Sequence, residues 1–332
     1  MRFDHLLALS DARGIFEHCS GDQPLPEHGY CVDDVARALV VLEREPVLTP
    51  ELEELADVCL SFLDESQSLT GEVTNRCDVR GRWHGDASVE DHWGRALWAW
   101  GTVIGRSSSR RRVLRAEDAF LRSAALRSPF MRSMAFAGLG AAEVLRVQPE
   151  DEHARSLLAH AAQAVSLPSD AAWPWPEPRL TYANGVIPEI HLLAGSILSR
   201  PELVTRGLGM LVWLMTIQTK GDHLSVVPSG GWSPGQPLPG FDQQPIEVAA
   251  LVDACATAFD ITGDPDWVIC MREAARWFDG HNDVSVVMHD PHTGAGYDGL
   301  KVRGRNENRG AESTLAYLSS MQQCMAREAL RL

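Results

Sequence analysis

Five short clusters of carboxylate, amide and aromatic residues recur at wide intervals along the chain. They occupy residues 27–34, 90–93, 182–189, 242–247 and 308–314. An acidic residue in the first turn of a helix often has no role beyond capping the helix or interacting with the helix dipole. Each of these clusters, however, opens a segment rich in small apolar residues, whereas the intervening segments open with generic residues. This contrast favours a common functional site.

Paired carboxyl groups are the chemistry that these clusters could supply. Hydrolysis of a glycosidic bond uses one carboxyl as a general acid, with a pKa raised by burial, and a second as base or nucleophile. We prefer Asp91 and Glu247 as this pair, because they stand in well-separated segments and have Trp or Gln neighbours. The full set of catalytic candidates is Asp34, Asp91, Glu189, Glu247 and Glu312.

Indole and amide groups near these carboxyl groups suit a sugar. The chain has 10 Trp and 4 Tyr, and an indole face can stack on sugar CH groups while polar side chains bind the hydroxyls. Tryptophans at helical spacing, such as Trp98, are expected in the core. Tryptophans in loops or first turns are expected either to bind the sugar at the site or to plug the rim. The predicted substrate-binding residues are Asp33, His92, Trp93, Trp83, Trp175, Asn184, Trp232, Gln243, Gln244 and Arg309.

Two other functions remain open at this point. A sugar epimerase or isomerase would use histidine as acid and base, and His28, His92 and His191 are available. In a non-catalytic glycan-binding protein, Trp side chains would bind the sugar, and every carboxylate would serve as a helix cap or in an ion pair. A hydrolase should show two carboxyl groups across an open cavity, and an epimerase two histidines beside a smaller, closed pocket.

Composition removes several other classes of function. The 332 residues include 30 Lys and Arg against 45 Asp and Glu, a formal net charge of -15, which disfavours nucleic acid and anionic membranes as partners. The motifs GxxxxGKS/T and HExxH do not occur, so no cofactor and no metal is predicted. The expected ligand is a short oligosaccharide, and the oligomeric state is left open.

The sequence also predicts a cytoplasmic protein. It contains no apolar run of about 18 residues and no signal-peptide pattern. Seven scattered cysteines without a CxxC pair are typical of buried, reduced thiols. The basic run 106–115 is interpreted as a solvated loop between two helices.

Helical periodicity dominates the chain, and two kinds of segment alternate. Some are charged on one face, which is typical of a helix with one wet side, and the others are apolar nearly all round. The only fair strand candidates are 224–227 and 284–288. The helical segments are expected near 3–19, 32–45, 50–66, 89–105, 113–126, 130–147, 151–166, 184–199, 201–218, 244–262, 264–281 and 309–330.

Alternation of wet and buried helices predicts six hairpins, with the buried helices inside. We therefore predict an all-α protein, an (α/α)6 barrel or six-hairpin toroid, that forms a single domain over residues 1–332. An open α-solenoid or two helical bundles are the alternative. Because the inner helices of such a barrel run parallel, their N-terminal ends, which carry the five clusters, should converge on one rim.

Three motifs resemble a family of helical-toroid proteins from bacterial glycan-utilisation clusters. They are GYCVDDVARAL at 29–39, EDHWGRA at 90–96 and NRGAEST at 308–314. Members of this family are labelled as glycosyltransferases or as glycoside hydrolases, and some are associated with mannoside phosphorylases. The resemblance covers most of the chain and implies a carbohydrate-active (α/α)6 barrel.

Overall fold

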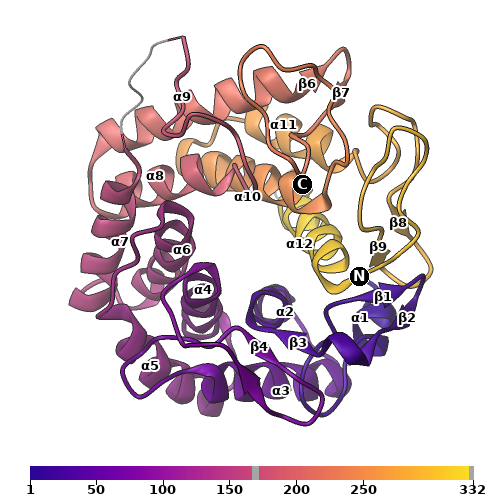
Figure 1. Cartoon of the computed structure of the whole chain (residues 1–332). Coiled ribbons are helices and arrows are strands. Elements are labelled where there is room, and N and C mark those ends of the chain that lie inside the picture. The colour runs from indigo at the N-terminus through magenta and orange to yellow at the C-terminus, as the bar shows by residue number, and fades with distance from the viewer. Residues whose placement is uncertain (167–171, 329–332) are drawn as a thin grey trace.

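The computed structural model describes residues 1–166 and 172–328, and this part of the chain contains twelve α-helices. Figure 1 shows them as two concentric rings. The inner ring consists of α2 (Val32–Arg44), α4 (Asp91–Arg106), α6 (Met131–Val147), α8 (Val186–Ile197), α10 (Pro245–Thr262) and α12 (Ala311–Glu328). The outer ring consists of α1 (Asp4–Ala8), α3 (Pro50–Ser66), α5 (Arg110–Ala124), α7 (Glu152–Ala164), α9 (Pro201–Gln218) and α11 (Asp266–Ala275).

The inner ring is closed. Each inner helix packs against the next inner helix along the chain, and α12 packs against α2, so the first and last inner helices are neighbours. Each inner helix also carries an outer partner, from α3 on α2 round to α1 on α12. The (α/α)6 barrel predicted from the alternation of wet and buried segments is therefore confirmed.

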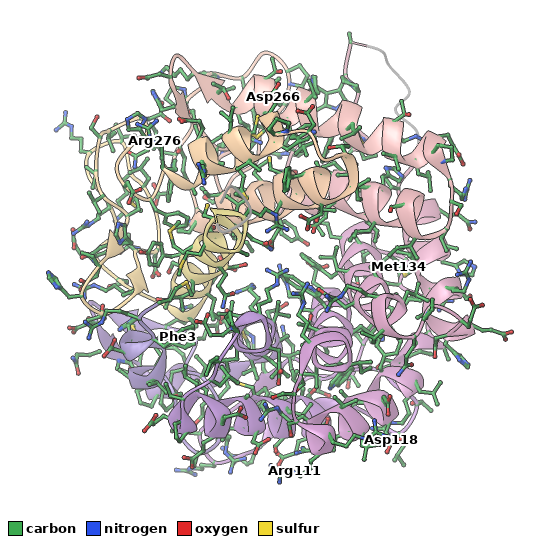
Figure 2. All side chains as sticks on the ribbon, turned by 180° about the vertical axis from the view of Figure 1, so that it is seen from behind. Phe3, Arg111, Asp118, Met134, Asp266 and Arg276 are labelled. Carbon is green, nitrogen blue, oxygen red and sulfur yellow. The ribbon has the colours of Figure 1, made fainter. Side chains whose placement is uncertain are left out.

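Small residues let the inner helices approach one another closely. A Cβ atom at Gly94 would overlap the backbone oxygen of Ser133, and one at Gly101 would overlap that of Gly140. Only glycine permits backbones to come this near. The tight contact between α4 and α6 therefore depends on the small residues that marked these segments as buried. Side chains on the outer ring, such as Arg111 and Asp118 on α5, instead point away from the barrel (Figure 2).

Short antiparallel strands tie the loops at the ends of the barrel. A three-stranded sheet of β3 (Tyr30–Cys31), β4 (Arg76–Cys77) and β5 (Trp83–His84) holds the segment that enters α2. The two-stranded sheets pair β1 (Cys19–Ser20) with β2 (Gln23–Pro24), β6 (Thr219–Lys220) with β7 (His223–Leu224), and β8 (His289–Asp290) with β9 (Ala295–Gly296). A 3-10 helix, η1 (Pro26–His28), precedes β3.

Two secondary-structure predictions were wrong. The helix expected over 3–19 ends at Ala8, because Oδ1 of Asp11 accepts hydrogen bonds from the backbone N–H groups of Arg13 and Gly14 and closes a turn instead. The strand expected over 284–288 does not form, and its neighbour over 224–227 is reduced to the short β7. Apart from Leu224 of β7, which pairs with Thr219, apolar residues of both segments pack against the core without strand pairing.

The basic run 106–115 was also misassigned as a loop. Helix α5 begins at Arg110, after the Oγ of Ser109 accepts a hydrogen bond from the backbone N–H of Arg112. Arg112 is 2 % exposed and forms ion pairs with Glu43 at 2.8 Å and with Glu53 at 2.6 Å. Its charge therefore joins α5 to α2 and α3 rather than facing solvent.

All seven cysteines lie within the described residues and carry free thiols. Among the helices of residues 1–166 and 172–328, none combines the length and apolar character that crossing a membrane requires.

Candidate active site

The N-terminal ends of the inner helices meet at one rim of the barrel, where they line two cavities. The first cavity, of about 460 Å³, lies among the starts of α2, α10 and α12. The second cavity, of about 600 Å³, lies among the starts of α2, α4 and α6 and the segment before α8. Asp33 lines both cavities, so they adjoin at the start of α2. The five clusters thus converge on one rim, around two adjoining cavities.

The first cavity is built around one arginine that holds two carboxyl groups. Nη1 of Arg37 donates to Oδ1 of Asp34 at 2.5 Å, and Nη2 donates to Oε2 of Glu312 at 2.8 Å. Asp34 is 3 % exposed, whereas the side chain of Glu312 is 39 % exposed. One carboxyl group is therefore sheltered from solvent and the other is open to it.

Burial controls the titration of this cluster. Burial raises the pKa of Asp34 to about 7, against the opposing effect of Arg37 and with a smaller contribution from Glu312. The thiol of Cys31 donates to Oδ2 of Asp34 at 3.1 Å. Burial alone would lower the pKa of Arg37, but Glu312 and Asp34 outweigh it and leave that pKa raised. The guanidinium therefore stays charged, while Asp34 can take up or release a proton near neutral pH.

Asp33 stands between the two cavities on a second arginine. Nδ2 of Asn75 donates to its Oδ2 at 3.0 Å, and Nε of Arg95 lies 3.2 Å from its Oδ1. Arg95 is 4 % exposed, and its guanidinium carbon lies 3.9 Å from the centroid of the Phe136 ring. Burial lowers the pKa of Arg95, and the nearby charge of Arg37 lowers it further. Two guanidinium groups thus lie close together beneath the rim.

The second cavity is framed by Asp91 and Tyr182. The Tyr182 hydroxyl donates to Oδ2 of Asp91 at 2.5 Å, and burial raises the pKa of Tyr182, so the hydroxyl keeps its proton. Nη1 of Arg132 donates to Glu177 at 2.7 Å, and its guanidinium carbon lies 4.9 Å from the Tyr182 ring centroid. His92 lines the wall, and its Nε2 lies 2.9 Å from the backbone oxygen of Val73.

Glu247 and Asn184 are buried behind the cavities and are not among the described residues that line either one. Asn184 has no exposed surface and Glu247 is 2 % exposed. Nδ2 of Asn184 donates to Oε2 of Glu247 at 2.8 Å, and Nη2 of Arg132 donates to Oδ1 of Asn184 at 3.1 Å. Burial raises the pKa of Glu247 to about 7. The structure therefore does not bring Asp91 and Glu247 face to face.

Glu189 lies deeper in the barrel than the sequence suggests. It lines a narrow neck of about 50 Å³ and a third cavity of about 290 Å³, which is formed by the C-terminal ends of the inner helices. Its Oε1 accepts a hydrogen bond from Thr257 at 2.9 Å. Burial raises the pKa of Glu189 well above its usual range, and the charge of Asp253 adds to this effect. It is thus separated from the rim cavities by the neck.

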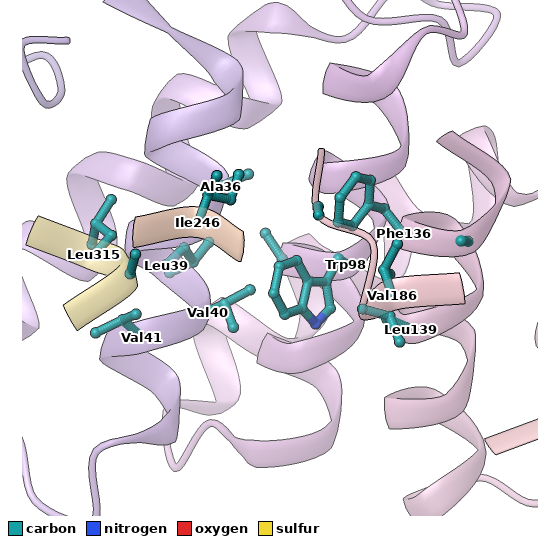
Figure 3. Packing of buried hydrophobic residues seen from close by; sticks show 14 of the residues in the cluster. Ala36, Leu39, Val40, Val41, Trp98, Phe136, Leu139, Val186, Ile246 and Leu315 are labelled. Atoms are coloured by element: carbon teal, nitrogen blue, oxygen red, sulfur yellow. The ribbon is translucent and has the colours of Figure 1, made fainter. Parts of the chain in front are cut away.

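Trp98, expected in the core, helps to form that neck. It is 8 % exposed and lines both the neck and the third cavity. Figure 3 shows its indole lying between Val40 of α2 and the side chains of Phe136 and Leu139 of α6. An indole face is therefore available inside the barrel rather than at the rim.

The tryptophans predicted at the rim are not among the described lining residues of the rim cavities, and Trp83, Trp175 and Trp232 pack against other aromatic rings. Trp93 has no exposed surface. The remaining centroid distances are 5.9 Å from Trp175 to Trp213, 5.7 Å from Trp232 to Trp173, and 4.8 Å from Trp83 to Phe62. The rings of Trp173, Trp175, Trp213 and Trp232 form a cluster beside α9. This arrangement agrees with the alternative interpretation, in which loop tryptophans plug the rim.

The remaining predicted binding residues divide between the cavity and its supports. Gln244 lines the first cavity. Gln243 has no exposed surface, and its Nε2 donates to Asp283 at 2.6 Å. Nη1 of Arg309 donates to Asp290 at 3.2 Å. Gln243 and Arg309 therefore hold the loops around α10 and α12.

The histidines considered for an epimerase do not meet. His191 has no exposed surface, and burial lowers its pKa to about 4. His28 lies in η1 and stacks edge-on against His18, with ring centroids 5.0 Å apart. His92 is in the wall of the second cavity. These three histidines do not flank a common pocket within the described structure.

Sequence reasoning missed Arg37, Arg95, Arg132 and Tyr182 as site residues. For Arg95 a signal exists: it follows Asp91 by four positions, just as Arg37 follows Asp33. Residues four apart lie on one face of a helix, so an inner helix with this spacing turns both groups toward the same cavity wall. Arg132 lacks such a pattern, whereas Tyr182 opens the cluster 182–189 but was not among the predicted binding residues.

One group of described residues places three possible metal ligands within 4.8 Å of one another, namely Glu17, Cys31 and Asp34. Arg76 forms an ion pair with Glu17, and Arg37 holds Asp34. Burial raises the pKa of Cys31 well above its usual value, which favours the thiol over the thiolate that metals bind. Both carboxylates of this group are therefore paired with arginines, and the thiol donates a hydrogen bond to Asp34.

Comparisons with solved structures place the fold among carbohydrate enzymes. A sugar epimerase from a ruminal bacterium superposes with a TM-score of 0.75 at 11% identity, covering 99% of this chain and 95% of that one. A D-mannose isomerase gives 0.70 at 11% identity over 96% and 93%. A GH76 α-mannanase from Bacteroides thetaiotaomicron gives 0.64 at 8% identity over 91% and 87%. No family model and no curated protein matches the sequence. The shared feature is the fold.

Proposed function

We propose that the protein is a carbohydrate-active enzyme with the chemistry of a glycoside hydrolase, in which Asp34 and Glu312 form the acid–base pair. The observation that carries this proposal is the cluster in which one guanidinium, that of Arg37, holds a sheltered and an open carboxyl group beside the same cavity. Fixing two reacting groups in one geometry is a large part of enzymatic rate acceleration.

The two carboxyl groups are suited to different roles. Asp34, with a pKa of about 7, can be protonated at neutral pH and donate its proton to the glycosidic oxygen as the bond from that oxygen to the anomeric carbon breaks. Water supplies the new bond to the anomeric carbon, and Glu312, open to solvent, accepts the proton that this water loses. The products are two sugars whose combined atoms equal substrate plus one water.

The charge of the first cavity favours a neutral saccharide. Its wall contains six acidic residues and two arginines: Glu17, Asp33, Asp34, Asp242, Asp298 and Glu312 against Arg37 and Arg76. This excess of negative charge disfavours uronates and phosphosugars, since like charges in a confined site repel. A neutral sugar can donate its hydroxyl groups to the same carboxylates.

A sugar epimerase or isomerase is the second candidate, favoured by the epimerase and isomerase whose folds cover almost all of this chain. The three histidines predicted for a histidine mechanism, His28, His92 and His191, do not line a common pocket in the described part of the chain. The reaction would instead use Asp34 as the base that removes a proton from the carbon beside the sugar carbonyl and returns it to the product. Arg37 and Arg95 would stabilise the intermediate oxyanion.

Product analysis separates the two reactions. We expect a panel of neutral manno-, gluco- and galacto-oligosaccharides to yield, for at least one member, shorter sugars with the mass of one added water. Asp34→Asn and Glu312→Gln should each lower kcat/KM at least 100-fold. Asp118→Asn, which alters an exposed carboxylate on α5, is the matched control and should be silent.

Other outcomes would redirect or end the proposal. A product of unchanged mass would identify an isomerisation, and the second candidate would replace the first. Wild-type turnover in both Asp34→Asn and Glu312→Gln would remove this pair from the chemistry altogether.

A further inference from the structure

The second cavity carries two exposed aromatic side chains that the acid–base cluster does not use. Phe130 is 51 % exposed and Tyr182 is 41 % exposed, and both line this cavity. Phe130 stands immediately before α6 and Tyr182 in the segment before α8. Apolar surface that lines a hollow and is rimmed by polar groups is typical of a ligand-binding groove.

Tyr182 is fixed in place before any ligand arrives. Its hydroxyl is held by Asp91 across the rim, and the guanidinium of Arg132 lies against its ring. Nε of Arg132 also donates to the backbone oxygen of Tyr182 at 2.6 Å. A ring held at its edge and on one side loses little conformational freedom when a ligand stacks on its remaining exposed surface.

We propose that the second cavity is a subsite for one neutral pyranose unit, which stacks on Tyr182 and Phe130 while Asp33, Asn75 and Asp91 accept or donate hydrogen bonds at its hydroxyls. Aromatic faces suit the CH face of a pyranose, and carboxylate and amide groups suit its rim of hydroxyls. This inference rests on the proposed function, because it assigns a further part of the same substrate.

The position of Asp33 sets the minimum length of that substrate. Asp33 lines both cavities, so a saccharide that occupies the second cavity continues past Asp33 to the pair Asp34 and Glu312. The ligand is therefore an oligosaccharide of at least two units that lies across the start of α2.

The charges of the second cavity restrict the unit to an uncharged sugar. Four acidic residues line it, and its one arginine, Arg132, is already committed to Glu177, to Asn184 and to the backbone of Tyr182. A uronic acid or sulfated unit would meet carboxylates without a free cation.

Calorimetric titration with mono-, di- and trisaccharides of mannose, glucose and galactose tests the subsite. For the series that binds, we expect Phe130→Ala to raise the Kd of the disaccharide about three- to tenfold, since a stacking contact is worth about 0.5–1.5 kcal/mol. Tyr182→Phe keeps the ring and should change Kd less than threefold. Leu121→Ala removes an equally exposed side chain, 50 % exposed on α5, and should leave Kd unchanged.

The outcomes separate this inference from the proposed function. Equal disaccharide binding by Phe130→Ala and Leu121→Ala would overturn the subsite, even where Asp34→Asn abolishes turnover. Loss of binding in Phe130→Ala together with wild-type turnover in Asp34→Asn would support the subsite and overturn the acid–base pair. Tighter binding of a disaccharide ending in glucuronic acid than of its neutral counterpart would also contradict the subsite.

Discussion

The two ends of the barrel both contain arginine–carboxylate pairs, but they are used differently. At the far end, Arg44 binds Asp253 at 3.0 Å and Arg106 binds Glu143 at 2.7 Å, around a cavity of about 290 Å³. At the rim, Arg37 holds two carboxyl groups beside a cavity of about 460 Å³.

The helix dipole explains why arginines occur at the far end of the barrel, but it does not explain the arginines at the rim. The far arginines stand in the last turns of inner helices, where a cation offsets the partial negative charge of the helix end. Arg37 and Arg95 stand in the second turns of α2 and α4, where the helix dipole gives a cation no such stabilisation. Their positions serve the carboxylates at the rim, which points to function rather than to helix stability.

The largest difference in turnover between the two ends should appear when a rim arginine, Arg37, and a far-end arginine, Arg44, are each replaced by methionine. Arg37→Met leaves Asp34 and Glu312 without a counter-ion, so we expect at least a 100-fold loss of kcat/KM and a destabilisation of about 3–5 kcal/mol. Arg44→Met strands Asp253 and should destabilise similarly, yet the folded fraction should retain kcat within threefold. Denaturant unfolding and turnover at matched folded fraction measure both. Equal loss of turnover in the two variants would erase the distinction between the ends.

A smaller effect should appear in the pH profile. If Asp34 is the general acid of a hydrolase, kcat/KM falls about tenfold per pH unit above its pKa of about 7. If Asp34 is the base of an isomerase, the fall occurs below that pH. Glu189→Gln, at the other side of the neck, should leave the profile in place. A shifted profile in Glu189→Gln would mean that the two regions titrate together.

The smallest effect concerns the stability contributed by Glu189. Because burial raises its pKa in the folded state, the folded protein binds this proton more tightly than the unfolded chain, and stability falls as pH rises from the ordinary carboxyl pKa to the folded value. Glutamine mimics the protonated form. We expect Glu189→Gln to match the wild type near pH 4 and to be more stable than the wild type at pH 8. A difference that does not vary with pH would contradict this.

The rings and the rim could be predicted from sequence because both follow from local patterns. Small residues such as Gly101 and Gly140 mark inner helices, and parallel inner helices bring their starts together. Depth along the barrel could not be predicted. Helix α8 contains Glu189 in its first turn, but that side chain reaches Thr257, which lies late in α10, so a residue near a helix start lies far below the rim.

The direction in which each aromatic side chain faces could not be predicted from the sequence either. Periodicity cannot tell an indole that faces a cavity from one that stacks on a neighbour, because both sit in apolar surroundings. Trp175 and Trp232 were predicted at the site for this reason, but they lie in the aromatic cluster beside α9. Trp98 belongs to the core, as predicted, and it also lines the neck.

The ion pair between Arg37 and Glu312 joins positions 275 apart in the chain. At elongation rates of about 5–20 residues per second, a ribosome needs roughly 14–55 seconds to travel from one to the other. During that interval α2 exists without its neighbour α12, and Arg37 is paired with Asp34 but lacks Glu312. Nascent chains therefore hold an unfinished ring, and the cluster around Arg37 is complete only when the final helix closes that ring.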